Sequence, residues 1–156
     1  MTGDPFVQED FRVLTPEAFE FVLNNELKRA VRSQNYLTLV LVDPHSEGRG
    51  PQEAVRDVAR IVSREVRETD LLSANEEGRL SMVLLDADLQ NSMRVIERLL
   101  ARIEHYQFPA PLAIEVGAAC CPTHGADAET LRRAASARPL TLRREPRNTS
   151  NASNAQ

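Results

Sequence analysis

Apolar residues recur along this chain with two different periods, and the period changes from segment to segment. A spacing of three to four residues predicts helices over residues 15–33, 52–68, 86–105 and 128–137. Runs of aliphatic and β-branched residues predict strands at Tyr36–Val42, Leu71–Ala74, Leu80–Leu85 and Leu112–Cys120. The resulting order, a helix, then β-α-β-β-α-β, then a helix, predicts an α+β domain of the ferredoxin-like type with an extra N-terminal helix.

Turn and capping residues divide these segments. Thr15 precedes Pro16 as an N-cap precedes the first helical position, and Asp86 or Asp88 caps the third helix. Residues 43–51 contain the Pro and Gly residues typical of a loop. Asn75 to Gly78 predicts a hairpin turn in which Gly78 supplies a positive φ.

The two ends of the chain differ in composition from the segment between them. Residues 1–13 show no periodicity and predict an irregular leader. Residues 138–156 are basic and then rich in Asn, Ser and Thr, which predicts a disordered tail. The predicted domain is therefore residues 14–137.

Bulk composition narrows the classes of partner. The chain has 156 residues, enough for one domain, and its net charge of −4 gives no general attraction to nucleic acid or to an anionic membrane. No apolar run is long enough to cross a bilayer. Cys120 and Cys121 are adjacent, which predicts neither a disulfide framework nor a zinc site. We therefore expect a cytoplasmic protein that binds neither nucleic acid nor membrane.

Several short segments, in order and in register, carry a family resemblance over Leu14 to Ala137. They are Val42-Asp43, Arg67-Glu68-Thr69-Asp70-Leu71, Leu80 to Asp88, and Ile114-Glu115-Val116-Gly117-Ala118 with Pro122 and Gly125. Together they resemble the GGDEF domain family, the diguanylate cyclases. The resemblance implies a nucleotide-cyclase-like fold and a role in bacterial nucleotide signalling.

The same register places the signature of the family on Glu76-Glu77-Gly78-Arg79-Leu80. In the family, two glycines admit GTP, and the acid at the third position binds a divalent metal together with the aspartate at Asp43. Here glutamates replace the glycines, Gly78 replaces that acid, and Arg79 reverses the charge of the next one. The loop after Asp43 is also shorter than the GTP-holding loop of the family.

These departures imply a degenerate domain that is not an enzyme. It would have no catalytic residues, no metal site and no cofactor, because hard cations need carboxylate or phosphate oxygens. Asp43 then has a second reading, as part of an Asp-Pro turn after a strand.

One ligand site of the family does keep its residues. The Arg-x-x-Asp pair, here Arg67 and Asp70, forms an inhibitory site for cyclic di-GMP in the family, and a second arginine falls on Arg98. A guanidinium can donate to guanine O6 and N7, and a carboxylate can accept from the N–H groups of guanine. The alternative is an ion pair at a helix C-terminus, where the helix dipole favours Arg.

The sequence therefore predicts a catalytically inactive regulatory domain that binds cyclic di-GMP through Arg67, Asp70 and Arg98. A ligand-free protein–protein interaction module is the alternative. Its partner would be an active cyclase, another protein or, in a homodimer, a second copy of the chain. An active diguanylate cyclase is the third reading.

Overall fold

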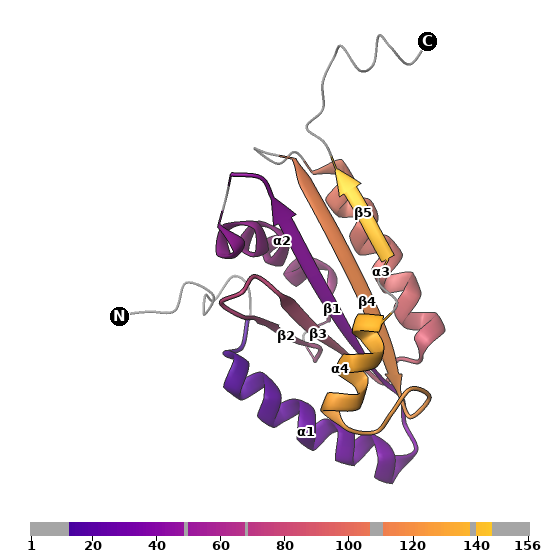
Figure 1. Ribbon diagram of the computed structural model, residues 1–156. Coiled ribbons are helices and arrows are strands. Elements are labelled where there is room, and N and C mark those ends of the chain that lie inside the picture. The colour runs from indigo at the N-terminus through magenta and orange to yellow at the C-terminus, as the bar shows by residue number, and fades with distance from the viewer. Residues whose placement is uncertain (1–12, 49, 68, 107–110, 138–139, 145–156) are drawn as a thin grey trace.

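The computed structural model describes residues 13–48, 50–67, 69–106, 111–137 and 140–144 (Figure 1). Residues 1–12 of the predicted leader and residues 138–139 and 145–156 of the predicted tail lie outside these ranges. Val13, the last residue of the predicted leader, is instead buried in the core. Helices and strands follow in the order α1 (Pro16–Ser33), β1 (Leu37–Ser46), α2 (Pro51–Glu65), β2 (Leu71–Ala74), β3 (Leu80–Leu85), α3 (Leu89–His105), β4 (Leu112–Cys121), α4 (Ala128–Ala137) and β5 (Leu140–Arg144). The predicted β-α-β-β-α-β order is confirmed from β1 to β4.

The described strands form one antiparallel sheet in the order β2-β3-β1-β4-β5. β1 lies in the middle, where Leu39 pairs with Val83 of β3 on one side and with Ala119 of β4 on the other. Having β1 between β3 and β4 is the ferredoxin-like arrangement, so the predicted fold class is confirmed.

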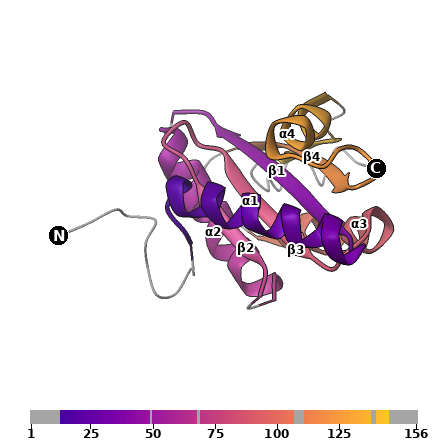
Figure 2. The same ribbon diagram turned by 90° about the horizontal axis from the view of Figure 1, so that it is seen from below.

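Helices cover both faces of the sheet, and Figure 2 shows α1 running across the strands when the molecule is seen from below. α2 and α3 pack on one face together with Val40 and Val42, whereas α1 and α4 pack on the other together with Leu39 and Leu41. Successive residues of a strand point to opposite faces, and here both faces are buried. This double burial explains why the apolar run of β1 is nearly unbroken.

The caps that the sequence predicts form as expected. The Thr15 side chain accepts a hydrogen bond from Ala18 N, and the Asp88 side chain accepts one from Asn91 N, so Asp88 rather than Asp86 caps α3.

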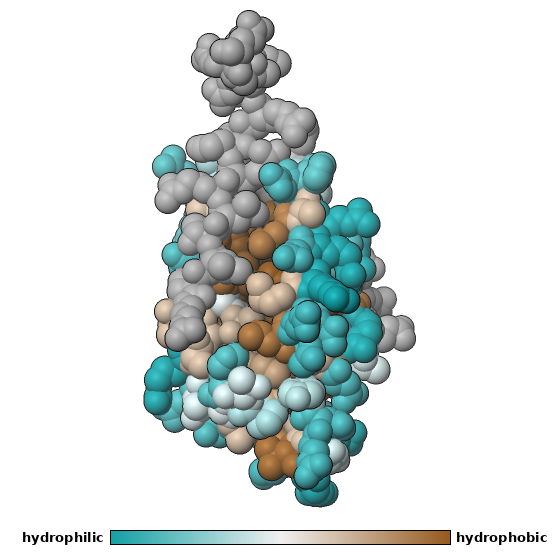
Figure 3. All heavy atoms as spheres, turned by 90° about the vertical axis from the view of Figure 1, so that its right-hand side faces the viewer, coloured by the Kyte–Doolittle hydropathy of each residue, from teal (hydrophilic) through white to brown (hydrophobic). Residues whose placement is uncertain are grey.

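None of the helices in the described part of the chain is long and apolar enough to span a membrane. Figure 3 looks at the α3 side of the molecule, where hydrophilic side chains border an apolar band.

The first strand is longer than the sequence predicts. Residues 43–46 were expected in a loop, but they continue β1 and pair with Leu112 to Glu115 of β4. Pairing with β3 stops at Val42 opposite Leu80, so beyond this point β1 has a neighbour on one side only. Pro44, which has no N–H, is tolerated at such an edge.

The end of the predicted domain also needs correction. Leu140–Arg144, assigned to a disordered tail from the basic composition, form β5 and pair with the first half of β4. Leu140 and Leu142 alternate with polar residues, a strand pattern that the surrounding arginines concealed. The folded domain therefore extends beyond Ala137 to at least Arg144. Residues 145–156, the rest of that tail, are outside the described ranges.

Candidate functional site

The hairpin between β2 and β3 holds Glu76 to Leu80, the segment that the sequence resemblance aligns with the signature of the family. Asn75 N donates to Arg79 O, and the Asn75 side chain accepts from Arg79 N, both at 2.9 Å. Gly78 adopts a φ of +91°, as the sequence predicts for this turn. This closed turn fixes the direction in which the side chain of Arg79 leaves the hairpin.

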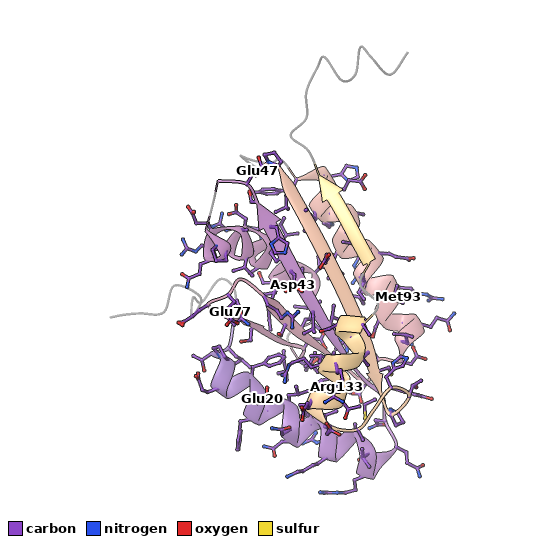
Figure 4. All side chains as sticks on the ribbon, in the orientation of Figure 1. Glu20, Asp43, Glu47, Glu77, Met93 and Arg133 are labelled. Atoms are coloured by element: carbon purple, nitrogen blue, oxygen red, sulfur yellow. The ribbon has the colours of Figure 1, made fainter. Side chains whose placement is uncertain are left out.

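That side chain reaches across to β1 and forms a two-pronged ion pair with Asp43, which Figure 4 labels on its strand. Arg79 Nε lies 2.8 Å from Asp43 Oδ1, and Arg79 Nη2 lies 3.0 Å from Asp43 Oδ2. The side chains are 32% and 26% exposed, so the pair is largely shielded from solvent. Its hydrogen bonds to Asp43, aided by the charges of Asp43 and Glu77, raise the pKa of Arg79 although burial opposes this.

Gly78 lies directly against the first residue of α2. A Cβ added at Gly78 would lie 2.6 Å from the Cβ of Pro51 and 3.0 Å from its carbonyl oxygen. Pro51 follows the short connection after β1. The length of this connection and the absence of a side chain at residue 78 are therefore linked by packing.

Arg67 and Asp70 are in contact, as the sequence predicts, but they differ in exposure. The Arg67 side chain is 60% exposed, whereas that of Asp70 is only 3% exposed. Asp70 Oδ1 accepts from Leu85 N at 3.1 Å and from Arg67 Nη2 at 3.2 Å. Asp70 Oδ2 accepts from Arg67 N at 3.1 Å and from Arg67 Nε at 3.3 Å.

These four bonds occupy the lone-pair sites of the Asp70 carboxylate. Arg67 Nη2 also donates to the carbonyl oxygen of Leu85. The pair therefore ties the residues that follow α2 to the end of β3, and Asp70 holds the guanidinium of Arg67 in a fixed orientation. The ion pair after a helix C-terminus, which was the alternative from the sequence, is therefore present, and its carboxylate is buried.

Arg98 reaches the same end of α2 from α3. Its Nε lies 3.2 Å from Oε1 of Glu65, the last residue of α2 and two residues before Arg67. Arg102, one turn further along α3, lies 3.0 Å from Glu65 Oε2 through its own Nε. Glu65 and Arg102 were not singled out from the sequence. The i, i+4 spacing of Arg98 and Arg102 on one helix was a signal for Arg102. Glu65 had no such signal, because it meets these arginines only through the packing of α2 and α3 on the same face of the sheet.

Two separate polar clusters thus lie at opposite ends of β3. Asp43 and Arg79 meet at its start, whereas Arg67 and Asp70 bind its last residue, Leu85. Six residues of extended chain place the two clusters roughly 20 Å apart. Among the described residues, no three His, Cys, Asp or Glu side chains are grouped so that they could hold a metal ion.

Comparison with known proteins shows a likeness of fold. No family model matches the chain, and no curated protein matches it in sequence. The GGDEF domain of DgcB from Caulobacter crescentus, solved in complex with c-di-GMP, matches with a TM-score of 0.71 at 14% identity, over 88% of this chain and 90% of that one. A DGC protein from Thermotoga maritima matches with a TM-score of 0.70 at 16% identity, over 82% and 99% of the two chains.

The diguanylate cyclase SiaD from Pseudomonas aeruginosa, solved in complex with its activator SiaC, matches with a TM-score of 0.65 at 18% identity. That match covers 85% of this chain and 56% of the other. These likenesses show that the chain has the GGDEF domain fold, which is found in proteins of cyclic di-GMP signalling.

Proposed function

We propose that this chain is a catalytically inactive GGDEF-like regulatory domain that binds cyclic di-GMP at Arg67, Asp70 and Arg98. The observation that carries the first half of the proposal is the ion pair between Arg79 and Asp43. The Arg79 guanidinium donates to both carboxylate oxygens of Asp43, which the resemblance aligns with the metal-binding aspartate of the family. A cytoplasmic location fits the two free cysteines, Cys120 and Cys121.

The residues present do not fit the divalent metal that this family uses. Such an ion needs several oxygen ligands, and phosphoryl transfer depends on metal ions that neutralise the developing charge. Both oxygens of Asp43 already accept hydrogen bonds, and Gly78 has no side-chain oxygen that could bind a metal. Arg79 adds a positive charge within 3 Å of Asp43, which opposes a cation there. Arg79 thus replaces the metal as the neutralising charge, and no step of GTP chemistry can use this carboxylate.

The receptor half of the proposal is supported by the other cluster. Arg67 and Arg98 lie near the same end of α2, with 60% and 55% of their side chains exposed. In this geometry Asp70 contributes by fixing the guanidinium of Arg67. Arg67 Nε and Nη2 already donate to Asp70 and Leu85, so a guanine edge or a phosphate gains a forked contact by taking over part of these bonds. Calorimetric titration with cyclic di-GMP tests this function, and Arg67→Ala locates the site.

A ligand-free interaction module is the second candidate, and one observation favours it. Arg67 is already bound to Asp70, and Arg98 is already bound to Glu65, so the domain neutralises its own arginines. In this reading the pairs only stabilise the junction of α2, β3 and α3. Titration separates the two candidates, because only the receptor binds the nucleotide.

The purified chain should form no cyclic di-GMP from GTP, with either Mg²⁺ or Mn²⁺. The physical reason is that Arg79 neutralises Asp43 and that residue 78, a glycine, supplies no carboxylate. The measurement is chromatographic detection of product, with an active cyclase as positive control. Product above the enzyme-free blank that disappears in Asp43→Asn would contradict the proposal.

A further inference from the structure

Glu65 occupies an unusual electrostatic position at the end of α2. It is the last helical residue, where the partial negative charge of the helix dipole disfavours a carboxylate. Its side chain is only 14% exposed, which adds a desolvation penalty. The carboxylate is retained there by Arg98 and Arg102, each of which contacts one of its oxygens.

The charges of Arg98 and Arg102 are less completely neutralised than that of Glu65. One negative charge is shared between two positive ones, so the cluster carries a net charge of about +1. The closest contact of each guanidinium is made through Nε, and the two side chains remain 55% and 67% exposed. They lie one helical turn apart and therefore point the same way from α3. A surface of this kind is suited to a phosphate group.

We propose that Glu65 is an internal gate on an anion site formed by Arg98 and Arg102. The proposal rests on the cyclic di-GMP site proposed above and adds two residues to it. In the closed state, the Glu65 carboxylate occupies the place of a ligand phosphate. A phosphodiester group of the dinucleotide displaces Glu65 and binds Arg98 and Arg102. Arg67 then binds the guanine base.

This competition explains why the helix end can release Glu65. The helix dipole already disfavours the Glu65 carboxylate at this position. When Glu65 leaves the two arginines it turns into water, which solvates the charge and avoids a further desolvation cost. Arg102 becomes a ligand-binding residue, and Glu65 lowers the affinity of the site for any anionic ligand. Without the gate, the two arginines would be free to bind phosphate at all times.

Glu65→Gln should tighten cyclic di-GMP binding by roughly three- to thirtyfold. The change removes the two ion pairs that compete with the ligand phosphate for Arg98 and Arg102, and it removes a negative charge that repels that phosphate. Glu129→Gln is the matched control. It also removes a glutamate paired with an arginine, Arg133, but it lies on α4, which packs on the opposite face of the sheet. Titration calorimetry of the full chain at low salt measures both variants.

Arg102→Ala in the Glu65→Gln background distinguishes a ligand contact from a structural role. If Arg102 binds phosphate, the double variant should bind at least threefold more weakly than Glu65→Gln alone. An equal affinity of the two would overturn the assignment of Arg102.

The outcomes for the gate are distinct from those for the receptor. If the wild type binds through Arg67 and Glu65→Gln binds equally well, the gate is overturned and the receptor stands. If Glu65→Gln binds and the wild type does not, the gate is supported, but the proposal that the wild-type chain is a receptor is overturned. If neither binds at high micromolar ligand, both proposals are overturned.

Discussion

Asp70→Ala should lower the free energy of unfolding by about 2–4 kcal/mol, a large effect for one carboxylate. The side chain is 3% exposed and accepts four hydrogen bonds, two of them from the backbone N–H groups of Arg67 and Leu85. Removing it leaves both N–H groups without their partner and frees Arg67 from its fixed orientation. Urea denaturation followed by circular dichroism measures the change.

Glu129→Ala is the control for this experiment. Glu129 also pairs with an arginine, but its side chain is 83% exposed, so its loss should cost less than about 0.5 kcal/mol. An Asp70→Ala variant as stable as Glu129→Ala would mean that the Asp70 network does not hold α2 to β3. Asp70 would then be available to a ligand rather than to the fold.

Gly78→Asp introduces an acid at the position that the resemblance aligns with the metal-binding acid of the family, and it should destabilise the domain by about 2–5 kcal/mol. A φ of +91° is strained for any residue with a Cβ. The added Cβ would also overlap Pro51, whose Cβ would be only 2.6 Å away. An acid at residue 78 therefore requires a rearrangement of the connection between β1 and α2.

Glu76→Asp, at an exposed position in the same turn, is the control and should change stability by less than about 0.5 kcal/mol. Both variants can be compared by the midpoint of urea unfolding. Equal midpoints for Gly78→Asp and the wild type would show that Pro51 does not restrict this turn. The absence of the acid would then be independent of the short connection.

Local signals were sufficient for most of the elements. Thr15-Pro16 and Asp88 mark helix starts by capping, and Asn75 to Gly78 forms the predicted turn, because each depends on residues no more than four apart. The order of periods along the chain then gave the ferredoxin-like topology. Strand ends were less predictable: Pro44 hid the second half of β1, and the arginines around Leu142 hid β5.

The candidate site was only partly visible in the sequence. The contact of Arg67 with Asp70 follows from their spacing, but the burial of Asp70 depends on Leu85, fifteen residues further along. Asp43 and Arg79 are thirty-six residues apart, and no local pattern pairs them. Glu65 meets Arg98 only because α2 and α3 pack on the same face of the sheet.

Calorimetric titration of the wild type and of Arg67→Ala with cyclic di-GMP tests the central claim most directly. Arg98→Ala, which removes an exposed side chain, serves as a second variant in case Arg67→Ala disturbs Asp70. The account predicts saturable binding by the wild type and a ten- to hundredfold loss in Arg67→Ala, since a bidentate contact to guanine is worth about 1–3 kcal/mol. No binding by the wild type at high micromolar ligand, or wild-type affinity in both variants, would contradict it.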